Sequence, residues 1–84
     1  MRSVLELVLS VVDGLGLCST VSSRGYAVHV QRDSERLLCV VHIGAGVVSV
    51  VPCGDGVGRA REIALVSEDG FCELLRVYLL GLLE

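Results

Sequence analysis

The sequence predicts an α+β domain in which an N-terminal and a C-terminal helix flank an antiparallel sheet. The middle of the chain, residues 25–52, is a mostly apolar, β-branched run that turn-forming residues interrupt twice. On either side, polar residues in 3–13 and apolar residues in 71–83 recur at helical spacing. With 84 residues the chain has the size of one domain, so we expect a single unit over residues 1–84.

The N-terminal helix is predicted from its polar residues, which trace one stripe along it: Ser3, Glu6, Ser10 and Asp13. The other positions of this segment are valine or leucine, so the helix should pack on more than one side. Gly14 is the residue expected to end it.

Two further segments alternate in polarity as strands do. Residues 15–22 predict a strand that forms a hairpin with the strand starting at Tyr26, the alternative being an extended connection. Residues 59–66 fit a strand at the sheet edge or a short helix, and we favour the strand. The expected sheet therefore has four strands, or five if residues 59–66 join it.

The first turn sets the register between the first two strands of the central meander. A four-residue loop at 33–36, built on a type I turn with aspartate at its start, places Arg32 opposite Leu37. Counting back from that pair brings Val30 opposite Cys39.

The second turn sets the next register. A two-residue type II′ turn at Gly44 and Ala45 places Val41 opposite Val48, because glycine supplies the positive φ that this turn requires. Both turns place the same apolar set on one face, which we predict to be the core face: Tyr26, Val28, Val30, Leu37, Cys39, Val41, Ile43, Val48 and Val50.

The opposite face is less polar than a surface in water should be. It carries Ala27, His29, Gln31, Leu38, Val40, His42, Val47, Ser49 and Val51. An antiparallel sheet with one solvated face shows mostly polar residues there. We therefore expect this face to be covered at least in part, by a helix of this chain or by another chain.

The C-terminal helix is predicted to begin after Ser67, an N-cap residue that two acids follow in the first turn. Its apolar residues are Phe71, Leu74, Leu75, Tyr78, Leu79, Leu82 and Leu83. A hairpin turn at 67–70 followed by a strand is the alternative, which leucine content disfavours. Val77 and Leu80 widen the apolar stripe beyond what one sheet face covers.

Composition points to a surface that needs a partner. Hydrophobic residues make up 52% of the chain, whereas a domain of this size buries only about 60–65% of its unfolded surface. Some apolar side chains must therefore form a contact patch. The net charge of -3, the absence of lysine and the scattered arginines disfavour nucleic acid as the partner.

Several compositional features bear on the compartment and source. No apolar run approaches the roughly 18–20 residues that span a bilayer. A signal peptide is disfavoured by Glu6 inside the apolar run and by Leu17 before the first cysteine. We expect a cytoplasmic protein. The absence of asparagine fits a thermophile, and a GC-rich genome gives the same depletion.

The cysteines at 18, 39, 53 and 72 lack the close pairing of a zinc site, so we expect no metal. Free buried thiols are the favoured interpretation, and disulfides of the kind that hyperthermophiles use are the alternative.

His29 and His42 share the less polar face and are diagonal neighbours in the predicted register. They lack a third metal ligand and an acid, and Ser49 is the nearest hydroxyl, so we expect neither a metal nor a catalytic site. No cofactor is expected. The histidines are predicted at the rim of a contact surface, where they are able to make it sensitive to pH.

These observations predict a non-enzymatic protein-interaction module, a homodimer or a small subunit of a larger assembly. Its predicted interface combines the outer sheet face with the excess apolar side of the last helix: Leu38, Val40, His42, Val47, Val51, Val77, Leu80 and Leu83.

The alternative is a module for an anion or a nucleic acid. A glycine-rich loop that leaves a strand is able to present backbone amides to phosphate, with arginines beside them. This predicted anion site consists of Gly54, Gly56, Gly58, Arg59 and Arg61.

Overall fold

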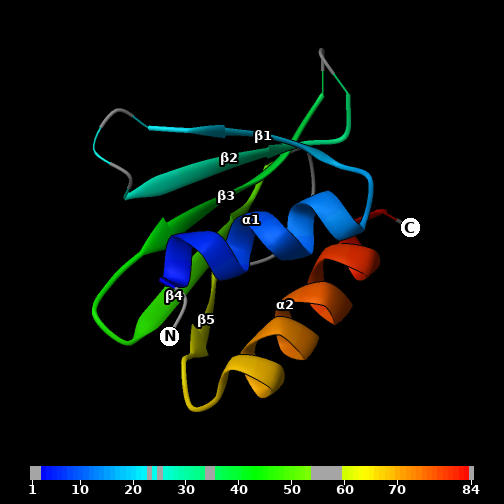
Figure 1. Cartoon of the computed structure of the whole chain (residues 1–84). Helices are drawn as coiled ribbons and strands as arrows, with labels where there is room; N and C mark the ends of the chain where they lie inside the picture. Colours follow the sequence, from blue (N-terminus) through cyan, green and yellow to red (C-terminus); the bar gives the residue numbers. More distant parts are fainter. Residues whose placement is uncertain (1–2, 23, 25, 34–35, 54–59, 84) are drawn as a thin grey trace.

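A computed structural model describes residues 3–22, 24, 26–33, 36–53 and 60–83 (Figure 1). It confirms the α+β class and five strands. The elements are α1 (Val4–Gly14), β1 (Cys18–Val21), β2 (Ala27–Gln31), β3 (Leu37–Ile43), β4 (Val47–Pro52), β5 (Arg61–Ala64) and α2 (Glu68–Leu83). All neighbouring strands are antiparallel, and the order β1-β2-β3-β4-β5 follows the chain. Within the described residues, no helix is long and apolar enough to cross a membrane.

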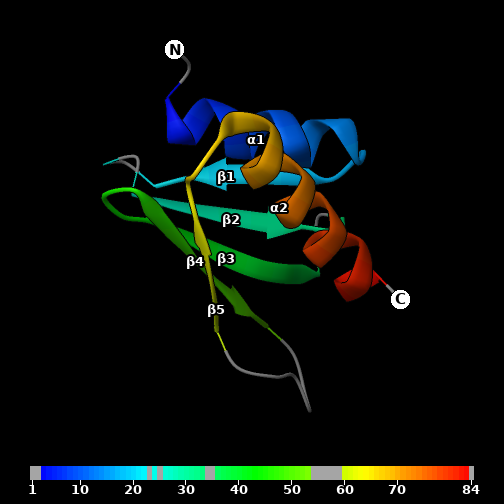
Figure 2. The ribbon, with the colours of Figure 1, turned by 90° about the horizontal axis from the view of Figure 1, so that it is seen from below.

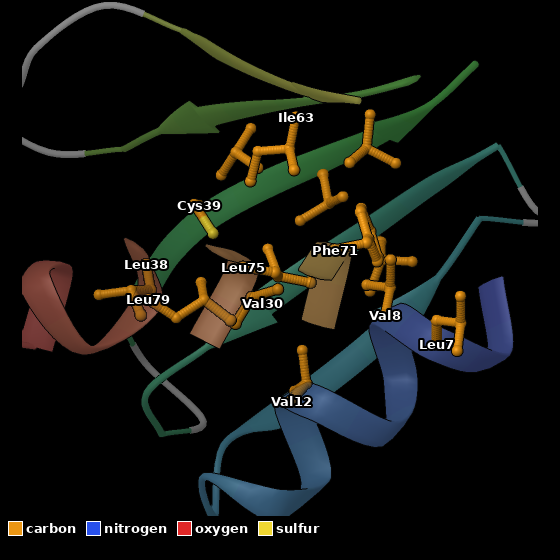
Figure 3. Packing of buried hydrophobic residues seen from close by; sticks show 14 residues of the cluster. Leu7, Val8, Val12, Val30, Leu38, Cys39, Ile63, Phe71, Leu75 and Leu79 are labelled. Atoms are coloured by element: carbon orange, nitrogen blue, oxygen red, sulfur yellow. The ribbon is translucent and has the colours of Figure 1, made fainter. Parts of the chain in front are cut away.

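Both helices lie on the same side of the sheet, and among the described residues no element covers the other side (Figures 1 and 2). One core cluster joins them to the sheet. Its buried residues are Leu7, Val8 and Val12 of α1, Val28, Val30, Leu38, Cys39, Val41, Val48, Val50 and Ile63 of the sheet, and Phe71, Leu75 and Leu79 of α2. Figure 3 shows these side chains meeting between the two layers.

Helix α1 begins where the sequence predicts, and the glycine that ends it comes two residues later than expected. The Ser3 side chain caps it by accepting a hydrogen bond of 3.2 Å from the backbone N–H of Glu6. The left-handed glycine is Gly16, with φ of 74°, and not Gly14, which is helical. Bonds from Gly16 N–H to Asp13 and from Leu17 N–H to Val12 complete a Schellman motif.

A bulge corrects the predicted pairing of β2 with β3. Val30 does lie opposite Cys39, as predicted, but Gln31 and not Arg32 pairs with Leu37. Arg32 is instead joined to Arg36, one residue before the predicted partner Leu37, because the Arg32 N–H donates to the carbonyl of Arg36 at 3.0 Å.

Leu38 is therefore the extra residue of β3, and its side chain turns into the core. Its predicted place in the interface is wrong, because strict alternation does not survive a bulge.

The β3–β4 register differs from the prediction by two residues. Val41 pairs with Val50, not with Val48. The turn centres on Ala45 and Gly46, and it is Gly46 that takes the positive φ, at 74°. A shift of two leaves each side chain on its predicted face, since strand side chains alternate with a period of two.

The core face is confirmed for Val28, Val30, Cys39, Val41, Val48 and Val50, which are all buried. Ile43 is half-buried and packs on the core. Leu37 pairs with Gln31 beyond the bulge and is not packed on the core, so its predicted place on the core face is wrong. Tyr26, which precedes β2, is 66% exposed, so its predicted place in the core is wrong.

The C-terminal part matches the favoured alternatives. Residues 61–64 form an edge strand, not a helix, and α2 is one continuous helix. Its N-cap is Ser67, whose side chain accepts a hydrogen bond of 3.1 Å from the N–H of Gly70.

Candidate functional site

The side of the sheet away from the helices is the first candidate surface, and we call it the open sheet face. Strand alternation and the observed pairing place thirteen described residues on it: Cys18, Thr20, Ala27, His29, Gln31, Leu37, Val40, His42, Val47, Ser49, Val51, Glu62 and Ala64. Each of them is half-buried or exposed. The expectation that a helix of this chain covers this face is therefore wrong for the described residues.

An apolar centre crosses the open sheet face. Val40 of β3 pairs with Val51 of β4, and His29 of β2 pairs with Val40 from the other side. Val51 is 36% exposed, while Val40 and Val47 are half-buried. Since opposite residues lie about 4.5–5.5 Å apart, Val40 and Val51 are in contact. Val47 lies further along β4, with Ser49 between it and Val51 on the same face.

Polar groups surround that centre. Thr20 donates a hydrogen bond of 3.4 Å from Oγ1 to Oε1 of Gln31, which orders one margin of the face. On the other margin, His42 pairs with Ser49, and Ser49 pairs with Glu62. An apolar centre with a hydrogen-bonding rim is the usual composition of a protein interface.

Glu62 is a member of this face that the sequence interpretation missed. The sequence predicts a strand over residues 59–66 but gives no register for it, so it does not decide on which side of the sheet Glu62 lies. Its alternation with Ile63, which is buried, was the available signal.

The histidines occupy one face as diagonal neighbours, as predicted, since His29 pairs with Val40 and His42 with Ala27. The row His42, Ser49, Glu62 does not form a catalytic triad, because the serine lies between the other two. In a triad the base stands between the nucleophile and the acid. Among the described residues, no group of three or more His, Cys, Asp or Glu is placed to hold a metal ion.

The outer side of α2 is the second candidate surface. Leu74, Val77 and Leu80 are 52%, 56% and 39% exposed, and we call these three residues the α2 ridge. Val77 lies about 200° around the helix axis from the buried Leu75, so the ridge faces away from the core. Leu83, predicted in the interface, is instead half-buried and packs on the core.

The predicted anion site falls mostly outside the described residues, which include none of Gly54, Gly56, Gly58 and Arg59. Arg61 is described and begins β5, where it pairs with Val50 on the helix side of the sheet. The element that begins at Arg61 is a strand and not a helix, so Arg61 does not lie in the first turn of a helix.

Arg61 is close enough to Tyr78 of α2 to influence it. Burial raises the pKa of Tyr78, negative charge at Cys39 adds to this rise, and the Arg61 guanidinium opposes it.

The four cysteines are free thiols, with Cys18 exposed, Cys39 buried, and Cys53 and Cys72 half-buried. Burial, with a smaller contribution from negative charge at Cys53, raises the pKa of Cys39 to about 12. The Cys39 thiol is therefore neutral and unreactive at physiological pH.

Comparisons with protein-family models, with curated proteins and with solved structures find no match to this chain. The case for a function therefore depends on the surfaces described above.

Proposed function

We propose that the chain is a non-enzymatic protein-interaction module that receives another protein chain on its open sheet face. The observation that carries this proposal is the placement of both helices on one side of the sheet, which leaves Val40, Val47 and Val51 in contact with water. Exposed apolar patches with a polar rim are characteristic of protein-binding surfaces. A second copy and a different subunit both fit this surface.

The charges of the open sheet face support a protein and not a nucleic acid as the partner. Glu62 is its one acid and arginine is absent among the described residues of the face. Nucleic-acid binding needs a basic field that displaces counterions from phosphate. We place the module in the cytoplasm, where its four free thiols stay reduced.

Site-specific photo-crosslinking in cells that produce the chain tests the proposal. A photoreactive benzoylphenylalanine replaces Val51 in one version of the chain and Val66 in another. Val66 is the matched control, because it is 91% exposed and lies outside the open sheet face and the α2 ridge. We expect a discrete protein adduct from position 51 and none from position 66.

The control also defines what would refute the proposal. The same adducts from both positions would mean non-specific contact, and no adduct from position 51 would mean that the open sheet face stays free. Circular dichroism of both purified versions verifies that they are folded. Either outcome in folded protein would remove the open sheet face as a docking surface.

A further inference from the structure

The α2 ridge has no covering element among the described residues, and it lies on the side of α2 opposite the core. Helix α2 already buries one full apolar stripe through Phe71, Leu75 and Leu79. A helix at the surface of a domain needs only that one stripe and carries polar residues on its outer side. Three large aliphatic side chains on the outer side therefore need a separate explanation.

The order of residue types along the ridge, Leu-Val-Leu, is the same from either end of the helix. Leu74, Val77 and Leu80 are spaced by three residues, so Val77 stands midway between two leucines that lie about 9 Å apart along the axis. A twofold interface uses one patch twice, and each residue on it must suit its symmetry mate. Two antiparallel copies of the ridge meet this requirement, with leucine against leucine and valine on the axis.

The residues beside the ridge fit the same arrangement. Near a twofold axis an unpaired charge meets its own copy and is repelled. Glu73 and Arg76 avoid this, because they neutralise each other at 2.8 Å within one helix. On the other flank Gly81 faces open space, with no atom within 4 Å of an added Cβ, so a second helix can approach closely.

We propose that the α2 ridge binds a second copy of this chain, with the two α2 helices packed antiparallel about a twofold axis at Val77. Leu74 of one chain packs on the partner's Leu80, and Leu80 on the partner's Leu74. The inference is independent of the proposed function, because the exposed ridge faces away from the core on α2, and α2 lies on the side of the sheet opposite the open sheet face. The dimer presents two open sheet faces. Its use as a divalent adaptor for a docked protein rests on the proposed function, whereas the dimer itself does not.

The size of the contact sets the expected affinity. Helix α2 has 16 residues and is about 24 Å long. One helix pair of that length buries less than the roughly 800 Å² per partner of a standard stable interface. We therefore expect a reversible dimer that dissociates on dilution through the micromolar range.

Analytical ultracentrifugation over a dilution series tests the dimer with three proteins: wild type, Val77→Arg and Val66→Arg. Arginine on the axis places two like charges together, so we expect Val77→Arg to weaken the dimer at least tenfold. Val66→Arg adds the same charge at an exposed site outside the ridge and should dimerise as wild type does. Because Val77 is exposed, its replacement leaves the core intact, which a urea titration of each protein verifies.

Cysteine crosslinking tests the antiparallel geometry, in a background where Cys18, Cys53 and Cys72 are replaced by alanine. Val77→Cys lies on the axis and should oxidise to a disulfide-linked dimer. Val66→Cys should not, because Val66 precedes Glu68, the first residue of α2, whose two copies lie about 27 Å apart along the antiparallel helices. A mixture of Leu74→Cys and Leu80→Cys chains should form the mixed dimer in preference to either homodimer.

The outcomes separate this inference from the proposed function. A wild type that stays monomeric at about 100 μM, well above a dissociation constant of a few micromolar, overturns the dimer but leaves docking on the open sheet face untouched. A dimer that survives Val77→Arg and is lost in Val51→Arg shows self-association through the sheet, which overturns the ridge interface alone. Preferred Leu74→Cys homodimers in the mixture would overturn the antiparallel packing.

Discussion

Val40 and Val51 lie directly opposite each other on neighbouring strands, on the side of the sheet that neither helix covers. Fully burying a valine contributes about 1.5–3 kcal/mol, and this pair leaves part of that free energy unrealised in the isolated chain. A partner that covers the pair gains it. The pair is therefore the centre of the proposed docking surface.

Replacing Val51 with threonine should separate folding from docking. Threonine keeps the β-branched shape that suits a strand, so the free energy of unfolding should change by no more than about 0.5 kcal/mol. The added hydroxyl has no partner in an apolar contact, so docking should weaken. Urea denaturation measures the first effect, and the yield of adducts from a photoreactive residue at position 40 measures the second. An unchanged adduct yield would contradict the role of Val51.

Salt dependence should distinguish the open sheet face from an arginine-based anion site. The adduct yield from position 51 should persist between about 0.1 and 1 M NaCl, because apolar contact is not screened. Binding to phosphate through arginine would fall steeply over the same range. A steep loss of the adduct with salt would favour the anion-binding alternative.

Two adjacent leucines of α2 should differ sharply in their contribution to stability. Leu75 is fully buried, and its replacement by alanine should reduce the free energy of unfolding by about 2–5 kcal/mol through cavity formation. Leu74 is 52% exposed, and Leu74→Ala should cost less than about 1 kcal/mol. Urea denaturation in dilute protein, where ridge contacts do not contribute, compares the two. Equal costs would mean that α2 presents a different side to the sheet.

The two glycines at the end of α1 should respond in opposite directions to alanine. Gly16 has φ of 74°, so Gly16→Ala should destabilise the chain by about 1–2 kcal/mol. Gly14 is helical and an added Cβ there meets no atom within 4 Å, so Gly14→Ala should stabilise by about 0.5–1 kcal/mol. Thermal denaturation of both variants measures this. The reverse order would place the end of the helix at Gly14, as the sequence alone suggested.

Stability should fall in alkali because of Cys39. Its thiol titrates near the ordinary pKa of 9.0 when unfolded and at about 12 when folded. Above pH 9 the unfolded chain therefore holds fewer protons than the folded chain, which favours unfolding. The stabilisation is complete below pH 9 and is lost between pH 9 and 12, at roughly 1.4 kcal/mol per pH unit.

Cys39→Val isolates this contribution, because valine fills the buried site without an ionisable group. The free energy of unfolding, measured by urea denaturation from pH 8 to 11, should decline less steeply with pH in the variant. The difference between the two slopes should correspond to about one proton. Tyr78, whose pKa is also raised, contributes a slope of the same sign in both proteins. Identical slopes would mean that Cys39 does not titrate between the two states.

Local pattern was sufficient to predict which side of a strand points inward. Val28, Val41 and Val50 are buried as predicted, although the β3–β4 register was wrong by two residues. The assignment of faces was still correct because side chains alternate along a strand, so a shift of two residues returns each side chain to the same face. The polar stripe of α1 and the Ser67 cap of α2 were predictable for a similar reason, since both depend on residues within one or two turns.

The bulge at Leu38 and the turn at Gly46 were not predictable from local chemistry. Each loop contains more than one residue pair able to close it, and the choice depends on hydrogen bonds across the whole ladder. Leu38 was therefore assigned to the interface while its side chain lies in the core.

The sequence by itself determined the order of helices and strands and the side of the central strands that points inward. It also determined that the chain has more apolar residues than its interior can hold. Only the tertiary structure decided where that excess lies, because it placed α1 and α2 together on one face of the sheet. Periodicity marks an apolar stripe on a strand or a helix but does not specify which neighbour will cover it. That choice is made by packing among distant segments, and here it leaves the valines of one sheet face and the outer residues of α2 exposed.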